Sequence, residues 1–134
     1  MKSASATPPP PCPCDTGLDY DACCGACHAG TPAADARALM RSRYSAYVLG
    51  NADYLRETWH PSTCPPALDL LDLSRTRWLG LAVKDFVETG DSATVTFIAR
   101  YRVGGGSAAR MRETSRFVRE YDVWWYVDGD VTEG

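Results

Sequence analysis

The sequence contains no long hydrophobic run, because no stretch approaches the roughly 18 consecutive apolar residues that a membrane-spanning helix requires. Residues Met1 to Thr7 lack the apolar core of a secretory signal. The sequence also lacks a nucleophile elbow and a paired-carboxylate motif. It has no phosphate-binding glycine loop, because Gly104, Gly105 and Gly106 fall where a hairpin turn is expected. We therefore expect a cytoplasmic protein with no membrane association, and we favour a non-enzymatic role.

The composition that remains is that of one globular unit. The 134 residues are 45% hydrophobic and 23% charged, and 14 basic against 17 acidic residues give a formal charge of −3. A chain of this length can bury about two-thirds of its unfolded surface. The chain is therefore long enough to form one hydrophobic core without disulfide bonds.

The cysteines are unevenly distributed, since five of the six lie within sixteen residues. Four of them form two close pairs, Cys12 with Cys14 and Cys23 with Cys24. In a reducing compartment such pairs favour a metal site over a disulfide framework, although disulfides and free thiols are the alternatives. Two thiol pairs on a turn-rich segment can converge on a tetrahedral Zn²⁺ ion.

Two further residues leave the ligand set open. Cys27 and His28 follow at once, and either is a reserve ligand that can replace Cys23 or Cys24. A surplus of soft ligands favours a closed, structural zinc site over a catalytic one with a water position. Cys64 is interpreted as an incidental thiol.

Three segments are expected along the chain. Residues 1–11 end in four prolines and predict a flexible leader. Residues 12–30 have few large apolar side chains, so we expect this zinc-binding segment to fold only when metal is bound. Residues 31–134 form the main domain.

The main domain begins with a helical pattern. Thr31 and Pro32 predict a helix start, and Gly50 predicts its end. Asn51 is expected to cap a second, shorter helix, and a third is predicted near 66–71.

A period of two then predicts four antiparallel strands near 77–88, 93–103, 109–120 and 123–128. Helices followed by a meander are typical of an α+β fold, in which the helices cover one face of a curved sheet.

The motifs carry a resemblance to known proteins. Residues Cys12–Gly17 and Cys23–Gly25 resemble the SEC-C zinc motif, although Asp15 and Thr16 stand where Gly and Ser are usual. The runs Leu39–Tyr44, Ala52–Leu55 and Thr58–Ser62 resemble the YchJ family (UPF0225), as do Trp78–Leu81, Arg116–Phe117 and Tyr126–Gly129. The resemblance implies an NTF2-like domain, a cone of helices on a bent sheet around a cavity. NTF2-like domains also often pair through their sheets, so a homodimer is one expectation.

Two residues are candidates for that cavity. Arg43 lies on the apolar stripe of the first helix, and Glu113 lies on the same strand face as Phe117. A buried arginine needs a partner, so a structural ion pair with Glu113 is expected. The alternative is that Arg43 binds a small anionic ligand, with the cavity wall shaped by four further residues: Tyr47, Tyr54, Trp59 and Ser115.

His60 follows the second helix. It is either a general base at the cavity mouth or a residue that interacts with the last helix carbonyls, and the second interpretation is favoured because general acid–base work needs a second positioned group.

Arginines are also expected to line up on the outer face of the sheet. The stripe consists of Arg100, Arg102, Arg110, Arg112 and Arg116. It is either a solvated face or a surface for nucleic acid or an acidic protein, and nucleic acid is not favoured because no exposed aromatics interleave the stripe.

Three functions therefore compete. The first is an adaptor whose zinc segment and body dock on an unknown protein partner, as the SEC-C resemblance implies. The second is a small-molecule binder or enzyme that uses the NTF2-like cavity. The third is an RNA-associated protein.

Overall fold

A computed structural model of the chain describes residues 10–65 and 76–133. Residues 1–9 of the expected leader and the helix expected at 66–71 lie outside these ranges. The elements in chain order are a 3₁₀ turn η1 (Tyr20–Ala22), helices α1 (Cys24–His28), α2 (Ala36–Leu49) and α3 (Ala52–Glu57), and strands β1 (Thr76–Thr89), β2 (Ser92–Val103), β3 (Ala109–Glu120) and β4 (Val123–Glu133).

Helix α2 begins later than the sequence predicts. Its N-cap is Asp35, whose side chain accepts a hydrogen bond from the backbone N–H of Ala38 at 2.7 Å. The expected cap, Thr31, instead donates its backbone N–H to the carbonyl of Ala26 and so belongs to the end of α1. The predicted end is confirmed, because Gly50 adopts the left-handed conformation at φ 73°.

Helix α3 starts where predicted. The side chain of Asn51 accepts a hydrogen bond from the N–H of Tyr54 at 3.1 Å, which satisfies one of the free donors of the first turn. The helix ends at Glu57, so Trp59 lies in the segment that follows it.

The four strands form one antiparallel sheet in the order β1-β2-β3-β4, as predicted. Strand β4 runs to Glu133 and is longer than the predicted 123–128. Asp128, Gly129 and Asp130 are typical turn residues, but they pair with Arg116, Ser115 and Thr114 of β3, and this pairing overrides the local preference.

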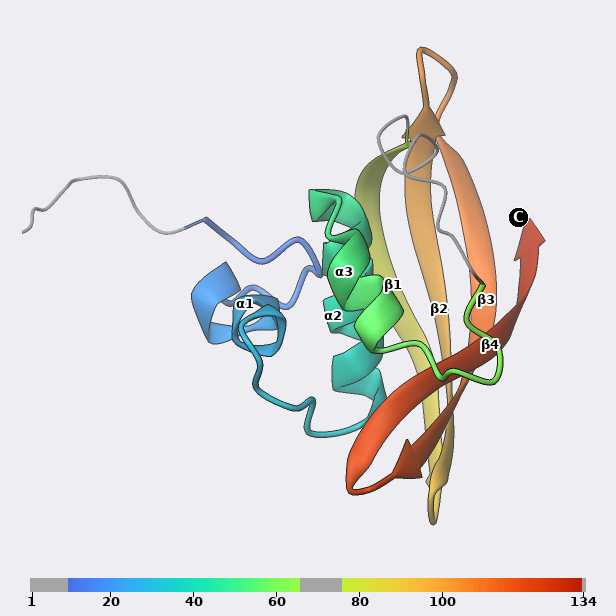
Figure 1. Cartoon of the computed structure of the whole chain (residues 1–134). Helices are drawn as coiled ribbons and strands as arrows, with labels where there is room; N and C mark the ends of the chain where they lie inside the picture. Colours follow the sequence, from blue (N-terminus) through green and yellow to red (C-terminus); the bar gives the residue numbers. More distant parts are fainter. Residues whose placement is uncertain (1–9, 66–75, 134) are drawn as a thin grey trace, which may run out of the picture.

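Helix α2 packs against one face of the sheet, and α1 lies on the far side of α2 (Figure 1). The fully buried side chains between α2, α3 and the sheet include Leu39, Leu55, Val95 and Phe117. The opposite face of the sheet carries no helix among the described residues. The body is therefore an α+β, NTF2-like arrangement with its core on one side.

Both edges of the sheet carry contacts from segments that are not strands. On β1, the N–H of Leu81 donates to the carboxylate of Asp15 at 3.0 Å. On β4, the N–H of Tyr126 donates to the carbonyl of Thr58 at 2.9 Å, and the carbonyl of Tyr126 accepts the N–H of His60 at 2.7 Å. The cysteine segment and the segment after α3 thus each hold one edge.

Candidate metal centre and cavity

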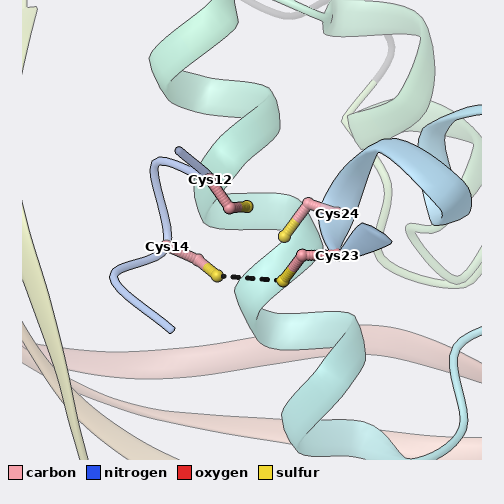
Figure 2. Close-up of side chains that lie close together, drawn as sticks. All are labelled: Cys12, Cys14, Cys23 and Cys24. Atoms are coloured by element: carbon pink, nitrogen blue, oxygen red, sulfur yellow. Dashed lines mark hydrogen bonds between the residues drawn. The ribbon is translucent and has the colours of Figure 1, made fainter. Parts of the chain in front are cut away.

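Four sulfur atoms converge next to α2. The Sγ atoms of Cys12, Cys14, Cys23 and Cys24 all lie within 4.8 Å of one another, and the Sγ atoms of Cys14 and Cys23 are 3.5 Å apart. Figure 2 shows the first pair approaching from a loop and the second from the start of α1. A tetrahedral ion with Zn–S bonds of about 2.3 Å places its sulfurs about 3.8 Å apart, so this set fits a tetrahedral metal without rearrangement of the backbone.

Local backbone geometry brings the first pair into place. The N–H of Cys12 donates to the carbonyl of Leu18 at 2.9 Å, which closes a tight loop around Cys14. Two residues of this loop, Asp15 at φ 66° and Gly17 at φ 86°, adopt the left-handed conformation. Gly is usual at the first of these positions in the motif, and Asp is one of the few other residues that tolerate it.

The departure from the usual Gly-Ser therefore leaves the loop intact and adds one contact. Thr16 Oγ1 lies 3.2 Å from Cys23 Sγ and accepts the N–H of Leu18 at 3.3 Å, so a hydroxyl is retained. Asp15 supplies the carboxylate that accepts a hydrogen bond from the edge of β1. Asp15 thus connects the loop to the sheet.

The second pair depends on a glycine. A Cβ added at Gly25 would lie 2.7 Å from the carbonyl oxygen of Tyr20 and 2.8 Å from its ring, distances that real Cβ atoms do not show. Only glycine allows Tyr20 to pack over the start of α1. The turn that presents Cys23 and Cys24 is therefore built around this contact.

Helix α2 supplies the platform for the cluster. Nη1 of Arg41 donates to the carbonyl of Cys14 at 2.8 Å, and Ser45 Oγ lies 3.6 Å from Cys12 Sγ. Cys12, Cys14 and Cys24 are buried. The sulfurs thus face a protein wall on one side, which leaves no broad opening for a substrate.

The thiol chemistry also suits a cation. Hydrogen bonding from Cys24, helped by Thr16 and opposed by burial, lowers the pKa of Cys14 to about 4. The pKa of Cys24 is raised, because it donates to Cys14 and is itself buried. One thiolate therefore forms readily, and its charge resists ionisation of its neighbours, so a divalent cation is needed to hold several thiolates together.

The two reserve ligands lie outside the cluster. Both ring nitrogens of His28 are engaged, Nδ1 with the hydroxyl of Tyr20 at 2.7 Å and Nε2 with the carbonyl of Ser42 at 2.8 Å. Burial raises the pKa of the Cys27 thiol. Cys64 is not a member of the four-sulfur cluster, and its sulfur lies 3.6 Å from the carbonyl oxygen of Pro65. The geometry brings together Cys12, Cys14, Cys23 and Cys24.

A cavity of about 210 Å³ lies between α2 and the inner face of the sheet. Of the predicted lining residues, the structure places four on its wall: Arg43, Tyr47, Glu113 and Ser115. Most of the remaining wall is apolar or aromatic: Met40, Tyr44, Trp78, Phe97, Met111, Phe117 and Tyr126. The cavity therefore suits a ligand with an apolar body and few polar groups.

Arg43 does not form the expected ion pair with Glu113 among the described residues. Its Nη1 donates to the carbonyl of Leu55 and to Thr58 Oγ1, both at 2.7 Å. Its guanidinium carbon lies 4.3 Å from the ring centre of Tyr126 and 5.0 Å from that of Trp59. Backbone and aromatic partners satisfy this 5% exposed side chain, and burial lowers its pKa.

Glu113 has other partners on the opposite wall. Its Oε2 accepts hydrogen bonds from Ser115 Oγ at 2.7 Å and from the hydroxyl of Tyr126 at 3.3 Å. Its side chain lies against Gly129, where an added Cβ would be 2.3 Å from Oε2. The cavity thus carries two opposite charges that are held apart.

Three predicted cavity residues lie elsewhere. The hydroxyl of Tyr54 pairs with Ser42 Oγ at 2.7 Å, between α2 and α3. Trp59 packs edge-on against Tyr126, with ring centres 5.1 Å apart. His60 bonds through Nε2 to Glu120 at 3.0 Å and through Nδ1 to Ser62 Oγ at 2.7 Å. The contacts of Trp59 and His60 hold the segment after α3 against β4 and β3.

The sequence reasoning missed the aromatic part of the wall. Tyr44 follows Arg43 on α2, and Trp78 sits before an irregularity in β1 that shifts the strand register, so a strict period of two does not place it. The indole N–H of Trp78 is buried and has no hydrogen-bond partner among the described residues. Arg43, which interrupts the apolar stripe of α2 between Leu39 and Tyr47, was the signal in the sequence that pointed to the cavity.

The expected arginine stripe divides into two parts. Arg116 bonds to Asp128 and Asp130 of β4, the second at 2.9 Å, so it is neutralised. The other four members lie toward the opposite end of the outer face, on β2 and β3: Arg100, Arg102, Arg110 and Arg112. The strand register thus places all five arginines on the outer face, as expected, but Arg116 is paired with aspartates.

Comparisons with known proteins agree with this architecture. The profile of the YchJ middle NTF2-like domain matches residues 35–129. A UPF0225 protein of Xanthomonas campestris is 57% identical over 92% of this chain and 96% of its own. A solution structure of a SEC-C motif containing protein from Rhodopseudomonas palustris is 37% identical with a TM-score of 0.80 and covers 89% of this chain and 96% of that one.

A crystal structure of a SEC-C motif containing protein from Psychrobacter arcticus is 29% identical with a TM-score of 0.75 and covers 92% of this chain and 83% of that one. The fold and the four-cysteine cluster thus define a protein with a SEC-C segment and an NTF2-like body. The chain belongs to the YchJ (UPF0225) family. None of the helices in the described ranges has the length and apolar content needed to cross a bilayer.

Proposed function

We propose that the protein is a zinc-dependent interaction adaptor, in which a metal-bound segment docks on a protein partner. The convergence of four cysteine sulfurs within 4.8 Å on residues 12–24 is the observation that carries this proposal. These residues contribute few apolar side chains to a core, so metal binding is their main source of folding free energy, about 10–16 kcal/mol in zinc-finger peptides.

Zinc is the metal that this donor set favours. Thiolates are soft ligands, and a closed tetrahedral set of four is typical of structural zinc sites. A bound ion would supply folding energy and fixed loop geometry. Cys12, Cys14, Cys23 and Cys24 would hold it, while Arg41 and Ser45 of α2 fix the cluster to the body.

The surface that the metal would stabilise has a defined chemistry. Leu18 is 52% exposed at the end of the loop, where its carbonyl accepts the N–H of Cys12, and Asp15, Asp19 and Asp21 near it are exposed acidic residues. An exposed leucine bordered by carboxylates is complementary to an apolar pocket with basic residues at its rim. We therefore assign the docking surface to Leu18 and its acidic neighbours.

A site-specific photo-crosslinker tests this surface. The reactive residue replaces Leu18 in the full chain, and a matched variant carries it at Leu49, which is 53% exposed at the end of α2. We expect a defined protein adduct from position 18 that the purified, identified partner reproduces. The adduct should disappear when Cys14→Ser is added.

Two results would overturn the adaptor function. One is an equal adduct from both positions, and the other is an adduct that persists in the metal-free Cys14→Ser chain. The zinc content of the purified, reduced protein is measured in the same experiment. A protein that contains no zinc would remove the basis of the proposal.

The cavity supports a second candidate function, the binding of a small anionic ligand. The observation that favours it is the 210 Å³ space with Arg43 in a mostly apolar and aromatic wall. Glu113 on the opposite wall limits the ligand to one acidic group near Arg43. Ligand-observed NMR with benzoate and indole-3-acetate tests this function. The function is supported if the protein binds these ligands and a folded Arg43→Met variant does not. It is contradicted if the variant binds them equally well.

A further inference from the structure

The outer face of the sheet carries a cluster of cations at one end. We call it the basic end and define it by five arginines of β1, β2 and β3: Arg77, Arg100, Arg102, Arg110 and Arg112. Arg77, Arg100, Arg110 and Arg112 are exposed, and Arg102 is half-buried. It lies toward the β2–β3 hairpin, away from the pair that Arg116 makes with Asp128.

The pairing register places like charges directly opposite one another. Arg100 of β2 faces Arg110 of β3, and Arg77 of β1 faces Arg102 of β2. Opposed like charges destabilise a sheet by roughly 0.2–1 kcal/mol a pair. A solvated face does not require such an arrangement, whereas an anionic ligand would compensate for it.

Three of these arginines have no carboxylate partner among the described residues, because no ion pair joins a carboxylate to Arg77, Arg100 or Arg112. The Nε atom of Arg102 is buried and has no hydrogen-bond partner in the part of the chain that the structure describes. Asp15, which lies beside Gly80 with Arg100, is engaged with the N–H of Leu81 at the rim. The charge of these three arginines is therefore available to an anion.

The basic end also contains a hollow. It encloses about 320 Å³ between the cysteine loop and the sheet, and its wall includes Asp15, Lys84, Arg100 and Arg110. The floor of the hollow includes two residues with small side chains or none, Gly80 and Ala82. A Cβ at Gly80 would lie 3.4 Å from Nη2 of Arg100, so the absent side chain keeps the guanidinium close to the floor. The hollow offers room for an anionic group between Lys84 and Arg100.

We propose that the basic end binds the phosphate backbone of a single-stranded nucleic acid. Arginines two residues apart on a strand are about 7 Å apart, so β2 and β3 each present evenly spaced guanidinium groups to an extended chain of anions. Exposed aromatics are missing from these rows, so contacts would be to phosphates and would show little sequence preference.

This occupant is preferred over two others. A second copy of this chain would bring arginines against arginines. An acidic protein segment carries carboxylates whose spacing varies with its sequence, whereas phosphates recur at a fixed spacing that two parallel rows of guanidinium groups can match. The inference does not depend on the adaptor function, because none of the five arginines of the basic end belongs to the docking surface around Leu18. Asp15, which borders both, is left unchanged in the variants below.

Fluorescence anisotropy with labelled 20-nucleotide oligo(dT) and oligo(U) tests the proposal on the full, zinc-supplemented chain. About five phosphate contacts predict a slope of roughly −3.5 in log K against log salt, or about a hundredfold weaker binding between 50 and 200 mM salt. The triple variant Arg100→Gln, Arg102→Gln and Arg112→Gln should weaken binding at least tenfold at low salt.

A matched triple variant controls for net charge: Arg56→Gln, Arg116→Gln and Arg119→Gln. It removes three arginines, two of which are paired with aspartates, and should change binding less than threefold. Circular dichroism confirms that both variants fold. The proposal fails if neither oligonucleotide binds at 50 mM salt, if the control loses as much affinity as the test variant, or if poly-glutamate binds as tightly as the oligonucleotides.

Discussion

The segment from Cys12 to Gly30 and the body from Asp35 to Gly129 differ in what fills their interiors. In the body, buried leucine, valine and phenylalanine side chains pack between helices and sheet. In the cysteine segment, the buried side chains are Cys12, Cys14 and Cys24. The first interior is stabilised by removing apolar surface from water, whereas we propose that the second depends on a coordinated cation. On that proposal, one chain uses two sources of folding free energy that respond to different treatments.

Loss of the metal should separate the two regions most strongly. Cys14→Ser removes one of four thiolates, and we expect residues 12–30 to lose their zinc and their protection against hydrogen exchange while the body stays folded. The free energy at stake is about 10–16 kcal/mol in comparable zinc peptides. Metal analysis and hydrogen exchange measure the two effects.

Cys64→Ser is the matched control, because Cys64 is not a member of the four-sulfur cluster and its loss should leave the metal content unchanged. Persistent protection of residues 12–30 in reduced, metal-free protein would show that packing on α2 alone holds the segment.

The next largest effect concerns the body. Arg43→Ala leaves the carbonyl of Leu55 and Thr58 Oγ1 without their donor and opens space between two rings. We expect a loss of about 3–5 kcal/mol in the free energy of unfolding. Urea titration measures it, with Arg37→Ala as the control, because Arg37 is an exposed residue of α2 whose guanidinium lies over the ring of Phe86 and not between two rings. An equal effect of both variants would mean that Arg43 has no special structural role.

High pH should weaken the body through its buried tyrosines. Burial raises the pKa of Tyr44 and Tyr54 to about 12 from the ordinary value of 10. Because the folded pKa is the higher one, their contribution is fully present below about pH 10 and is lost as pH rises toward 12, at about 1.4 kcal/mol per unit of raised pKa.

Thermal unfolding between pH 9 and 12 tests this direction. Tyr54→Phe should reduce the slope with pH, although it also removes the hydrogen bond to Ser42. A melting temperature that is constant across this range would contradict the expected linkage.

A smaller effect is expected from Gly129→Ala. The new Cβ would lie 2.3 Å from Glu113 Oε2 and 2.9 Å from its carboxyl carbon, so Glu113 must move. Overpacking of this kind costs about 1–3 kcal/mol. Gly105→Ala is the control, since no atom lies within 4 Å of its added Cβ. Denaturant titration should show a loss for Gly129→Ala alone.

The smallest effect concerns the contact between the two regions. Asp15→Ala removes the acceptor for the N–H of Leu81 and places alanine at φ 66°, which we expect to cost about 1 kcal/mol at this exposed site. Asp15→Asn keeps an acceptor and a residue that tolerates this conformation. Faster exchange of the Leu81 amide in Asp15→Ala but not in Asp15→Asn checks the assignment.

Much of the fold follows from local patterns in the sequence. Gly50 and Asn51 mark the junction of α2 and α3, and the alternation in β2 and β3 defines the buried face. The start of α2 was misplaced because two capping residues, Thr31 and Asp35, compete within one turn. The length of β4 depends on pairing with β3, which a single strand's composition does not report.

The candidate sites also include features that the sequence predicts and features that it does not. Clustered cysteines are visible in the sequence because all four lie within a short segment. The partners of Arg43 were not predictable, since Leu55 contributes a backbone carbonyl that any residue would offer. The neutralisation of Arg116 depends on strand register, which places Asp128 opposite it across the sheet.

The contacts on the two outer strands have a consequence for self-association. A strand at the border of a sheet presents unpaired N–H and C=O groups, which recruit strands from other chains and start aggregation. Here Asp15 occupies a donor of β1, and Thr58 and His60 occupy groups of β4. Because Asp15 is held by the loop between Cys14 and Gly17, we expect the release of a bound metal to free the N–H of Leu81 on β1. The proposed metal site would then also limit edge-to-edge association of the chain.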